Sequence, residues 1–289
     1  MIIWLASYPR SGNTLLRTLL YQTMGLASVT DENDESDKGL DNSNRFMIGL
    51  ADRPHPWDEF YRTASESRKL FLVKTHRPPR DDFPAIYVVR DGRKSCLSYS
   101  HFHRSFSPET HPSLLDVVLG NDYYGNWSGH FKTWATRKNT LLVSYEDLVK
   151  ASESLVAKLA THLGYCGPIA AWQNPFDQLH QAHPNFFRQG ETEWQNDPEW
   201  PLWIDALFFH LHGDLMIKLD YCTPEAVSAA RSNLPNDFLP LLNKAHCLVT
   251  EKKQFEQICA DRQLVIEGLK HACDERLNLI QALNNREVK

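Results

Sequence analysis

One segment decides the fold that this sequence predicts: Ser7-Tyr8-Pro9-Arg10-Ser11-Gly12-Asn13-Thr14. It follows a short apolar run, residues 2–6, that is typical of a buried strand, and it precedes a helical pattern of leucines that ends at Gly25. A strand, a tight loop and a helix in this order can hold a phosphate group, because the first N–H groups of the helix have no intrahelical partner and the helix dipole favours an anion. An ordinary strand-to-helix turn has the same pattern, so this segment alone leaves both interpretations open.

The loop carries its own cation. Arg10 precedes the small residues Ser11 and Gly12, which let the backbone approach an anion closely. The loop of kinases and other NTPases instead reads Gly-x-x-x-x-Gly-Lys-Ser/Thr, with the lysine on the terminal phosphates. Here Ala6 stands at the first glycine position and Asn13 at the lysine position. We therefore expect a nucleotide whose transferred group carries less charge than a phosphoryl group.

This segment resembles the loop that holds the 5′-phosphosulfate group in sulfotransferases that use 3′-phosphoadenosine 5′-phosphosulfate (PAPS). The resemblance implies that PAPS is the co-substrate and that no metal ion is required. It also implies that Arg10 takes part in catalysis. The implied contacts to the 5′-phosphosulfate come from Arg10, Ser11, Gly12, Asn13 and Thr14.

A second apolar run ends in residues that suit acid–base chemistry. Residues 70–73 predict a buried strand, and Lys74, Thr75 and His76 follow it. Ligands of an open parallel sheet bind at the carboxyl ends of its strands. Lys-Thr-His followed by proline is similar to a motif of the same family, which implies that His76 is the general base for the acceptor hydroxyl and that Lys74 contacts the sulfuryl group. An imidazole with a pKa near ~6.5 takes up a proton at neutral pH, although a lone histidine after a strand is more often structural.

A third apolar run, residues 85–89, predicts a strand that leads into Arg90 and Asp91. Arg90 and Ser98 can both reach one phosphate, the arginine through its two-pronged guanidinium group. The family resemblance assigns this pair to the 3′-phosphate of PAPS. Two other interpretations stay open. In the first, Arg90 pairs with Asp91 in a structural role. In the second, Asp91 ends a Walker B strand and coordinates magnesium in a P-loop kinase.

Two further stretches extend the resemblance. It implies that Tyr145 and Phe176 lie near the adenine ring. The stretch Arg188-Gln189-Gly190 resembles a segment that closes over the 3′-phosphate, and these three residues complete the predicted nucleotide site. Gln189 replaces a lysine of the family pattern, which removes one cation, so we expect a loop that becomes ordered on nucleotide binding.

The apolar runs joined by helical patterns predict an α/β fold, a P-loop-type open parallel sheet flanked by helices, plus a long C-terminal helix. A fourth strand is predicted at residues 140–144. Residues 28–44 are rich in Asp, Asn, Ser and Glu and predict an exposed loop. The family resemblance covers residues 1–222, which we expect to form the sulfotransferase domain. Residues 223–289 then form a helical, coiled-coil extension.

The extension has an apolar stripe broader than a strict heptad seam, within one helical pattern over residues 241–285. A helix that exposes such a stripe must bury it against a second copy of the chain, a partner or its own globular domain. We favour a homodimer formed as a coiled coil. Arg262 and Arg276 interrupt one register of the stripe.

Composition narrows the class of protein. The 289-residue chain has a net charge of −5, so we expect no general nucleic-acid binding. Its six cysteines form no Cys-x-x-Cys pair, which favours reduced thiols in a cytoplasmic protein. No apolar stretch approaches the ~18 residues that a membrane span needs. The pairs His101/His103 and His210/His212 predict no metal site, because residues two apart on a helix point in different directions.

The sequence thus predicts an enzyme that transfers the sulfuryl group of PAPS, in line, to a hydroxyl on a small-molecule, sugar or lipid acceptor. The alternatives are a P-loop kinase that uses Asp91 with ATP and magnesium, and a non-catalytic nucleotide-binding scaffold whose tail docks a partner. The motifs do not specify the acceptor.

Overall fold

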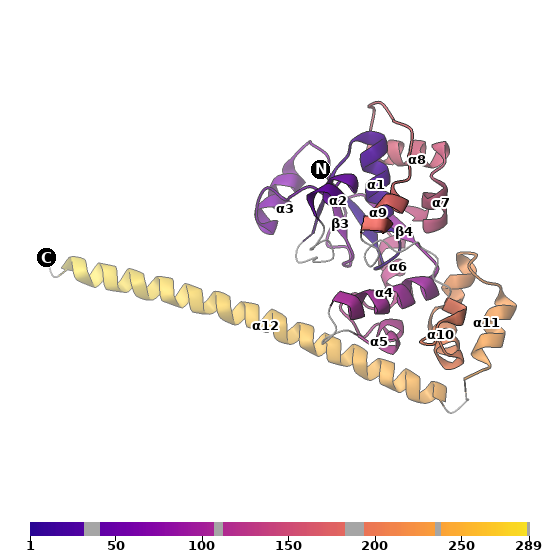
Figure 1. The fold of residues 1–289 in the computed structure, drawn as a ribbon. Helices are drawn as coiled ribbons and strands as arrows, with labels where there is room; N and C mark the ends of the chain where they lie inside the picture. The colour runs from indigo at the N-terminus through magenta and orange to yellow at the C-terminus, as the bar shows by residue number, and fades with distance from the viewer. Residues whose placement is uncertain (32–40, 107–111, 183–193, 235–237, 288–289) are drawn as a thin grey trace. The chain divides into compact units, whose positions relative to one another are not determined.

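The structure is a computed structural model, and it describes residues 1–31, 41–106, 112–182, 194–234 and 238–287. The chain forms two compact units, Met1–Leu234 and Pro235–Lys289 (Figure 1). The helix α11 (Pro224–Arg231) packs on α10 (Leu202–Lys218) within the first unit. The end of the sulfotransferase domain near residue 222 stays a prediction from the sequence resemblance.

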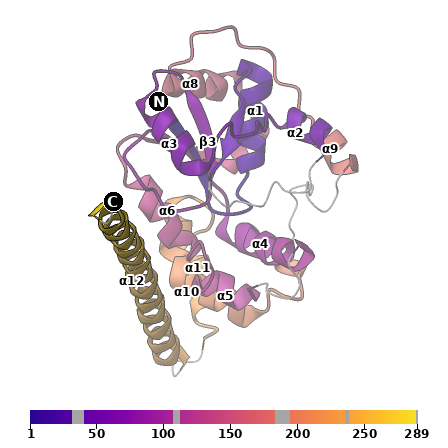
Figure 2. The ribbon, with the colours of Figure 1, turned by 90° about the vertical axis from the view of Figure 1, so that its left-hand side faces the viewer.

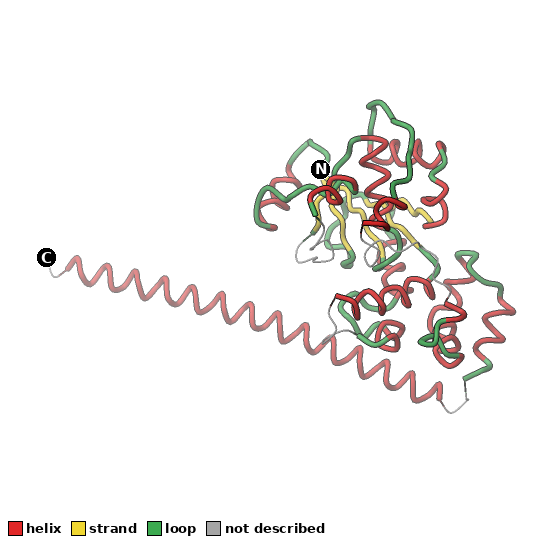
Figure 3. The backbone as a smooth tube through the Cα atoms, viewed as in Figure 1, coloured by secondary structure: helices red, strands yellow, loops and turns green. Residues whose placement is uncertain are grey.

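A parallel sheet of five strands, in the order β2-β3-β1-β4-β5, forms the centre of the first unit (Figure 3). The strands are β1 (Ile2–Ser7), β2 (Ser28–Thr30), β3 (Phe71–Thr75), β4 (Ala85–Val89) and β5 (Thr140–Ser144). The strand β1 pairs with β3 on one side and β4 on the other, so that Ala6 lies opposite both Thr75 and Tyr87. The segments that follow these three strands therefore meet at one edge of the sheet.

Helices cover both faces of the sheet, as Figures 1 and 2 show. On one face, Leu5 and Val88 belong to an apolar core with α1 (Asn13–Met24), α7 (Tyr145–Lys150) and α8 (Glu153–Leu163). On the other face, Trp4 contacts Trp57 of α3 (Trp57–Glu66), and Tyr87 stacks on Trp134 of α6 (Trp127–Ala135). The remaining elements of the first unit are α2 (Asn42–Met47), α4 (Gly92–Phe106), α5 (Leu114–Leu119), α9 (Phe176–Ala182) and the short 3-10 helix η1 (Trp194–Asn196).

The predicted class is confirmed, because the sheet is open, parallel and flanked by helices. The helix boundaries follow from their end residues. Gly25 and Gly164 end α1 and α8 with φ of 69° and 63°, a left-handed conformation that glycine adopts without strain. Ser152 begins α8 by accepting a hydrogen bond from the backbone N–H of Leu155.

The exposed loop predicted at residues 28–44 is wrong in part. Residues Ser28–Thr30 form the edge strand β2, which pairs with β3, and Ser28 is almost fully buried. The side chain of Arg17, buried in α1, donates a hydrogen bond of 2.8 Å to the Ser28 hydroxyl. A polar residue can be buried when another side chain satisfies its hydrogen bonds, as Arg17 does for Ser28. The polar composition of the segment was therefore a poor guide to its burial.

The second unit is described by one helix, α12 (Phe238–Glu287), which confirms the predicted long C-terminal helix. Its described large apolar side chains are exposed, and they include Leu241, Leu248, Phe255, Ile258, Leu264, Val265, Ile266, Leu269 and Leu277. Across the described ranges, every helix is too short or too polar to cross a lipid bilayer.

Candidate nucleotide and transfer site

The loop between β1 and α1 has an unusual backbone. Arg10 has a φ of 60°, a left-handed value that is uncommon for a residue other than glycine. The guanidinium group of Arg90 donates a hydrogen bond of 3.1 Å to the carbonyl oxygen of Arg10, which fixes this conformation from the end of β4. A conformation of this kind is costly and is maintained where the surroundings enforce it, often at functional sites.

Gly12 is required at its position for two reasons. Its φ is 103°, and a Cβ atom built on it would lie 2.6 Å from the Tyr145 ring. Gly12 therefore lets the Tyr145 ring lie directly against the loop. The same contact places Tyr145, one of the two predicted adenine neighbours, beside the predicted phosphate loop.

The other loop residues differ in their contacts. The Asn13 side-chain amide donates to the carbonyl oxygen of Leu5 at 2.8 Å, which ties the start of α1 to β1. The Ser11 hydroxyl shares a hydrogen bond of 3.2 Å with the hydroxyl of Ser95 on α4. Thr14 is partly exposed in the first turn of α1, where backbone N–H groups lack intrahelical partners.

Two arginines and a serine come together at the carboxyl ends of β1 and β4. The guanidinium group of Arg10 lies 4.7 Å from the Phe102 ring centroid, and its Nε donates to the Ser98 hydroxyl at 3.4 Å. The guanidinium group of Arg90 lies 4.4 Å from the Tyr145 ring centroid. Arg90 and Ser98 are only 5% and 4% exposed. Arg90 is thus largely desolvated and Arg10 is half-buried, and two cations beside a helix N-terminus form a positive site for an anion.

Lys74 lies next to this cluster in the sheet. It pairs in register with Leu5 of β1, and it is only 3% exposed. Paired residues of neighbouring strands point to the same face, so Lys74 points to the face that Leu5 shares with α1. A third cation therefore lies on the side of the sheet where α1 begins.

His76 follows β3 and turns toward the loop after β1. Its Nδ1 lies 2.8 Å from the Ser7 carbonyl oxygen and 3.3 Å from the Ser7 hydroxyl. A carbonyl oxygen only accepts hydrogen bonds, so Nδ1 carries the proton and Nε2 is the basic nitrogen of the neutral ring. The Tyr124 ring packs edge-on against the imidazole, with the ring centroids 5.8 Å apart.

A buried histidine supports the backbone of His76. His130 Nε2 lies 2.8 Å from the His76 carbonyl oxygen, and His130 Nδ1 lies 2.9 Å from the Tyr87 hydroxyl. Burial lowers the pKa of His130 to about 4. His130 is therefore neutral at pH 7, donating from Nε2 to His76 and accepting at Nδ1 from Tyr87.

The last predicted site residues are only partly described. Phe176 and Phe102 both pack against the buried pair Ile48 and Leu179, and Phe176 also borders the core against which Tyr145 packs. Tyr145 thus lies against Arg90, and Phe176 packs on the same small cluster as Phe102, the ring that Arg10 contacts. Arg188, Gln189 and Gly190 lie outside the described residues.

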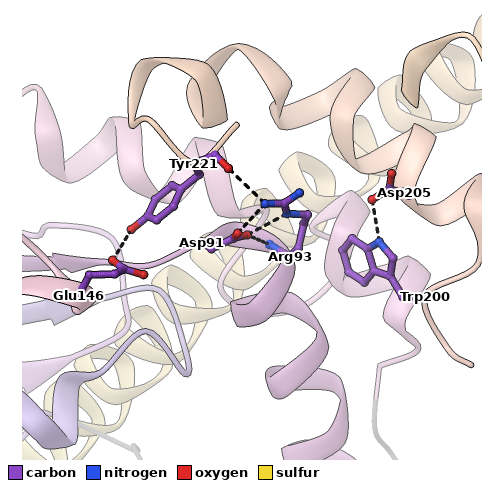
Figure 4. Close-up of polar contacts among 6 residues, drawn as sticks. All are labelled: Asp91, Arg93, Glu146, Trp200, Asp205 and Tyr221. Carbon is purple, nitrogen blue, oxygen red and sulfur yellow. Dashed lines mark hydrogen bonds and ion pairs between the residues drawn. The ribbon is translucent and has the colours of Figure 1, made fainter. Parts of the chain in front are cut away.

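The carboxylate of Asp91 is engaged by an arginine of the same turn (Figure 4). Arg93 donates to it from Nε at 3.1 Å, from a terminal nitrogen at 2.7 Å, and from its backbone N–H at 2.9 Å. Arg93 also donates to the Tyr221 carbonyl oxygen at 3.3 Å and lies 4.3 Å from the Trp194 ring centroid. The Tyr221 hydroxyl in turn donates to Glu146 at 3.0 Å. Arg93, which Asp91 holds in place, therefore joins the start of α4 to later parts of the first unit.

No group of three or more His, Cys, Asp and Glu side chains in the described ranges is arranged to hold a metal ion. His212, which belongs to one of the discounted histidine pairs, is buried between the Ser128 hydroxyl at 2.8 Å and the Val118 carbonyl oxygen at 3.1 Å. Its environment is that of a packed core histidine.

Sequence reasoning missed four contributors to this arrangement: Ser95, Phe102, Tyr124 and His130. Ser95 and Phe102 lie three residues before and four residues after Ser98, so helical spacing alone could have placed them on one face of α4. His130 is separated from His76 by 54 residues, and no local pattern connects the two.

The fold and the cluster after β1, β3 and β4 define an α/β protein of the phosphate-loop type. A family model described as "Sulfotransferase domain" matches residues 2–181, and the chain belongs to this family.

Individual relatives are distant. The chain is 27% identical over 195 residues to mouse (Mus musculus) "Sulfotransferase 4A1", an alignment that covers 62% of this chain and 65% of the relative. It is 30% identical over 128 residues to "3-alpha-hydroxysteroid sulfotransferase" of Cavia porcellus, which covers 38% of this chain and 45% of that relative. The chain thus spans less than two thirds of the length of these curated relatives.

A solved structure of mouse sulfotransferase SULT7A1 complexed with PAP has a similar fold. It has a TM-score of 0.51 and 17% sequence identity, and the match covers 80% of this chain and 87% of that chain.

Proposed function

We propose that this protein is a PAPS-dependent sulfotransferase that transfers the sulfuryl group to an acceptor hydroxyl. The single observation that carries the proposal is the pairing of Arg90 with the loop around Arg10, at the N-terminus of α1. This arrangement suits a nucleotide with phosphate groups at both its 5′ and 3′ positions. The sulfotransferase family to which the chain belongs supports the same reading.

The residues present fit such a nucleotide. Arg10 and the first amides of α1 would hold the 5′-phosphosulfate, together with Ser11, Gly12, Asn13 and Thr14. Gly12 lets the Tyr145 ring lie directly against this loop, where a Cβ atom would clash with the ring.

Arg90 and Ser98 would hold the 3′-phosphate, and Arg188-Gln189-Gly190 would complete that contact from the opposite side. Tyr145 and Phe176 would lie against the adenine ring. The contact of Arg90 with the Tyr145 ring supports this division, because it brings the 3′-phosphate residue and an adenine neighbour together.

His76 is the proposed general base. PAPS supplies an activated sulfuryl group bonded to the 5′-phosphate oxygen. His76 Nε2 would take the hydroxyl proton as the acceptor oxygen forms its bond to sulfur, and the bond from sulfur to the 5′-phosphate oxygen breaks. The hydrogen bond from Nδ1 to the Ser7 carbonyl oxygen supports this role, because it fixes the tautomer that has a basic Nε2.

Lys74 and Arg10 would stabilise charge on the bridging oxygen and the sulfuryl oxygens. Lys74 points to the face of the sheet that faces α1, which supports this assignment. A sulfuryl group carries less negative charge than a phosphoryl group, so positioning by these cations supplies much of the rate.

The kinase alternative is less well supported. It requires the Asp91 carboxylate to coordinate magnesium. That carboxylate already accepts two hydrogen bonds from the Arg93 side chain (Figure 4). Freeing Asp91 would leave the Arg93 cation without its carboxylate in a site where both side chains are largely buried. A non-catalytic scaffold would also use the arginine cluster to bind a nucleotide. It would have no use for a His76 ring whose Nε2 is held in the basic form, so this alternative leaves the His76 contact with Ser7 without a function.

The long helix supports a second proposal, that the protein is a homodimer through a coiled coil of α12. The described apolar residues Leu241, Leu248, Phe255 and Leu269 follow a seven-residue spacing that omits Arg262. A second copy of the chain is therefore one expected partner. The other is the acceptor, which is a hydroxyl-bearing small molecule, sugar or lipid. We place the protein in the cytoplasm as part of the same proposal.

Sulfur-labelled PAPS incubated with a panel of hydroxyl acceptors tests the proposal, with His76→Asn as the variant. Asparagine keeps a side-chain donor for the Ser7 carbonyl but has no basic nitrogen. We expect turnover to fall by roughly 10²–10⁴ while nucleotide affinity stays within about threefold. A His76→Asn protein that turns over at the wild-type rate with saturating acceptor would show that the base lies elsewhere.

A further inference from the structure

A buried carboxylate accompanies the arginine on which the proposed 3′-phosphate contact depends. Asp91 directly follows Arg90 in the chain, and the two residues are only 6% and 5% exposed. Charges interact strongly where water is largely excluded. An uncompensated carboxylate at this position would therefore oppose the attraction of Arg90 for an anion.

Arg93 compensates this carboxylate. Its side chain donates to one oxygen of Asp91 at 3.1 Å and to the other at 2.7 Å, and its backbone N–H adds a third hydrogen bond at 2.9 Å. Only 11% of the Arg93 side chain and 8% of the Asp91 side chain are exposed, so solvent screens this ion pair weakly. Within the described ranges, Asp91 forms its ion pair with Arg93 and not with Arg90.

The Tyr221 hydroxyl shows that these charges share one environment. It donates to Glu146 at 3.0 Å, beside the contact of Arg93 with the Tyr221 carbonyl oxygen (Figure 4). Burial is the main cause that raises the pKa of Tyr221, and the carboxylates of Glu146 and Asp91 raise it further. Arg90 acts in the opposite direction and lowers it. The charges of Asp91 and Arg90 therefore both reach this hydroxyl. Glu146 is exposed, so water screens its charge more than that of Asp91.

Several later parts of the chain hold Arg93 in place on Asp91. The guanidinium group lies 4.3 Å from the Trp194 ring centroid and 5.3 Å from that of Phe209, and it donates to the Tyr221 carbonyl oxygen at 3.3 Å. Contacts on this scale fix a long side chain that would otherwise have many rotamers. Arg93 is thus committed to Asp91 and to these neighbours.

We propose that Arg93 is a positioning residue of the nucleotide site, which neutralises Asp91 so that Arg90 keeps its attraction for the 3′-phosphate. With Arg93 in place, Arg90, Asp91 and Arg93 together carry a net positive charge. Without Arg93, the charge of Asp91 offsets that of Arg90. The inference rests on the proposed function, because it takes Arg90 to hold the 3′-phosphate. It adds that Arg93 acts on the nucleotide through Asp91, without touching it.

Isothermal titration calorimetry with 3′-phosphoadenosine 5′-phosphate (PAP) and adenosine 5′-monophosphate (AMP) tests this, because the two nucleotides differ only in the 3′-phosphate. We expect the wild-type protein to bind PAP more tightly than AMP. Arg93→Gln should weaken PAP binding by about tenfold and change AMP binding by less than about twofold. The ratio of the two dissociation constants is the readout, because a general loss of structure would weaken both ligands alike.

The double variant Arg93→Gln with Asp91→Asn separates the charge from the fold. Asparagine has no charge and is as good a residue as aspartate for the start of a helix, where Asp91 accepts from the Arg93 N–H. We expect the double variant to bind PAP within about threefold of the wild type. If Arg93 contacted the phosphate itself, or only held the fold together, removing the Asp91 charge would not restore PAP binding. Should Arg93→Gln alone fail to fold, the double variant decides, because it leaves neither charge of the pair unpaired.

Arg104→Gln is the matched control, because Arg104 is another ion-paired arginine of α4 and its partner is Glu199. It should keep the wild-type preference for PAP. An Arg93→Gln protein with the wild-type preference, or a double variant that does not regain it, would overturn the proposal. A wild-type protein that binds PAP and AMP equally would show that the proposed 3′-phosphate site is wrong, and the inference would fall with it.

Discussion

The guanidinium group of Arg90 donates a hydrogen bond of 3.1 Å to the backbone carbonyl oxygen of Arg10, and this bond joins the end of β4 to the loop after β1. Arg90 therefore has two functions in our account: it holds the left-handed conformation of Arg10, and it contacts the 3′-phosphate. Both are lost when the side chain is removed.

We expect Arg90→Ala to weaken PAP binding by roughly 1.5–3 kcal/mol, the usual value of a charged hydrogen-bonded contact. Calorimetric titration with PAP measures this directly. Lys158→Ala, a change of an exposed cation on α8, should leave the affinity unchanged. An Arg90→Ala protein that binds PAP as tightly as the wild type would remove Arg90 from the nucleotide site.

Gly12→Ala should reduce both stability and PAP affinity. The new methyl group would lie 2.6 Å from the Tyr145 ring at a φ of 103°, so the loop or the ring must move. We expect a loss of about 1–3 kcal/mol in the free energy of unfolding, measured by urea denaturation.

Gly164→Ala provides the control for backbone strain alone. Its φ is 63°, and nothing lies within 4 Å of the added atom. It should cost about 1 kcal/mol of stability and leave PAP affinity intact. Equal losses of PAP affinity in the two variants would mean that the approach of Tyr145 to Gly12 is irrelevant to nucleotide binding.

His130 should make the fold sensitive to acid. Burial lowers its folded pKa to about 4, whereas the unfolded chain has a histidine pKa of about 6.5. Between these values the unfolded state binds more protons, so stability falls as the pH falls from 6.5 towards 4. The contribution lost approaches about 3 kcal/mol.

His130→Gln removes the titrating ring and keeps one donor for the His76 carbonyl. We expect its urea midpoint to change less than that of the wild type between pH 7 and pH 5. In this pH range the histidine of the unfolded chain takes up its proton while His130 of the folded protein stays neutral. Parallel pH profiles for the two proteins would show that His130 does not titrate on unfolding.

Much of this site was predictable because strand ends converge in a parallel sheet. Lys74, His76 and Arg90 each follow an apolar run, and β3, β1 and β4 are neighbours, so their ends meet. The strand β2 was not predictable from polarity, because the partner that allows Ser28 to be buried is Arg17 on another element. His130 was hidden for a similar reason: its contact with His76 exists only in the folded chain.

Self-association through α12 has its own test. Leu269 is 61% exposed and continues the seven-residue spacing of the stripe, so Leu269→Glu should convert a dimer to a monomer in light scattering at micromolar concentration. Lys270→Glu, a charge change at the next residue, should leave the dimer intact. A wild-type protein that is already monomeric at this concentration would refute the coiled coil.

The central claim is that the arginine cluster around Arg10 and Arg90 binds a 3′-phosphorylated adenine nucleotide without a metal ion. A thermal-shift assay in a metal chelator tests it most directly, because a ligand that binds only the folded state raises the melting temperature. We predict that PAP raises it by several degrees in the chelator, and that ATP with magnesium, in a parallel sample without chelator, raises it much less. A rise with ATP and magnesium, and none with PAP, would contradict the account and favour a kinase that uses Asp91.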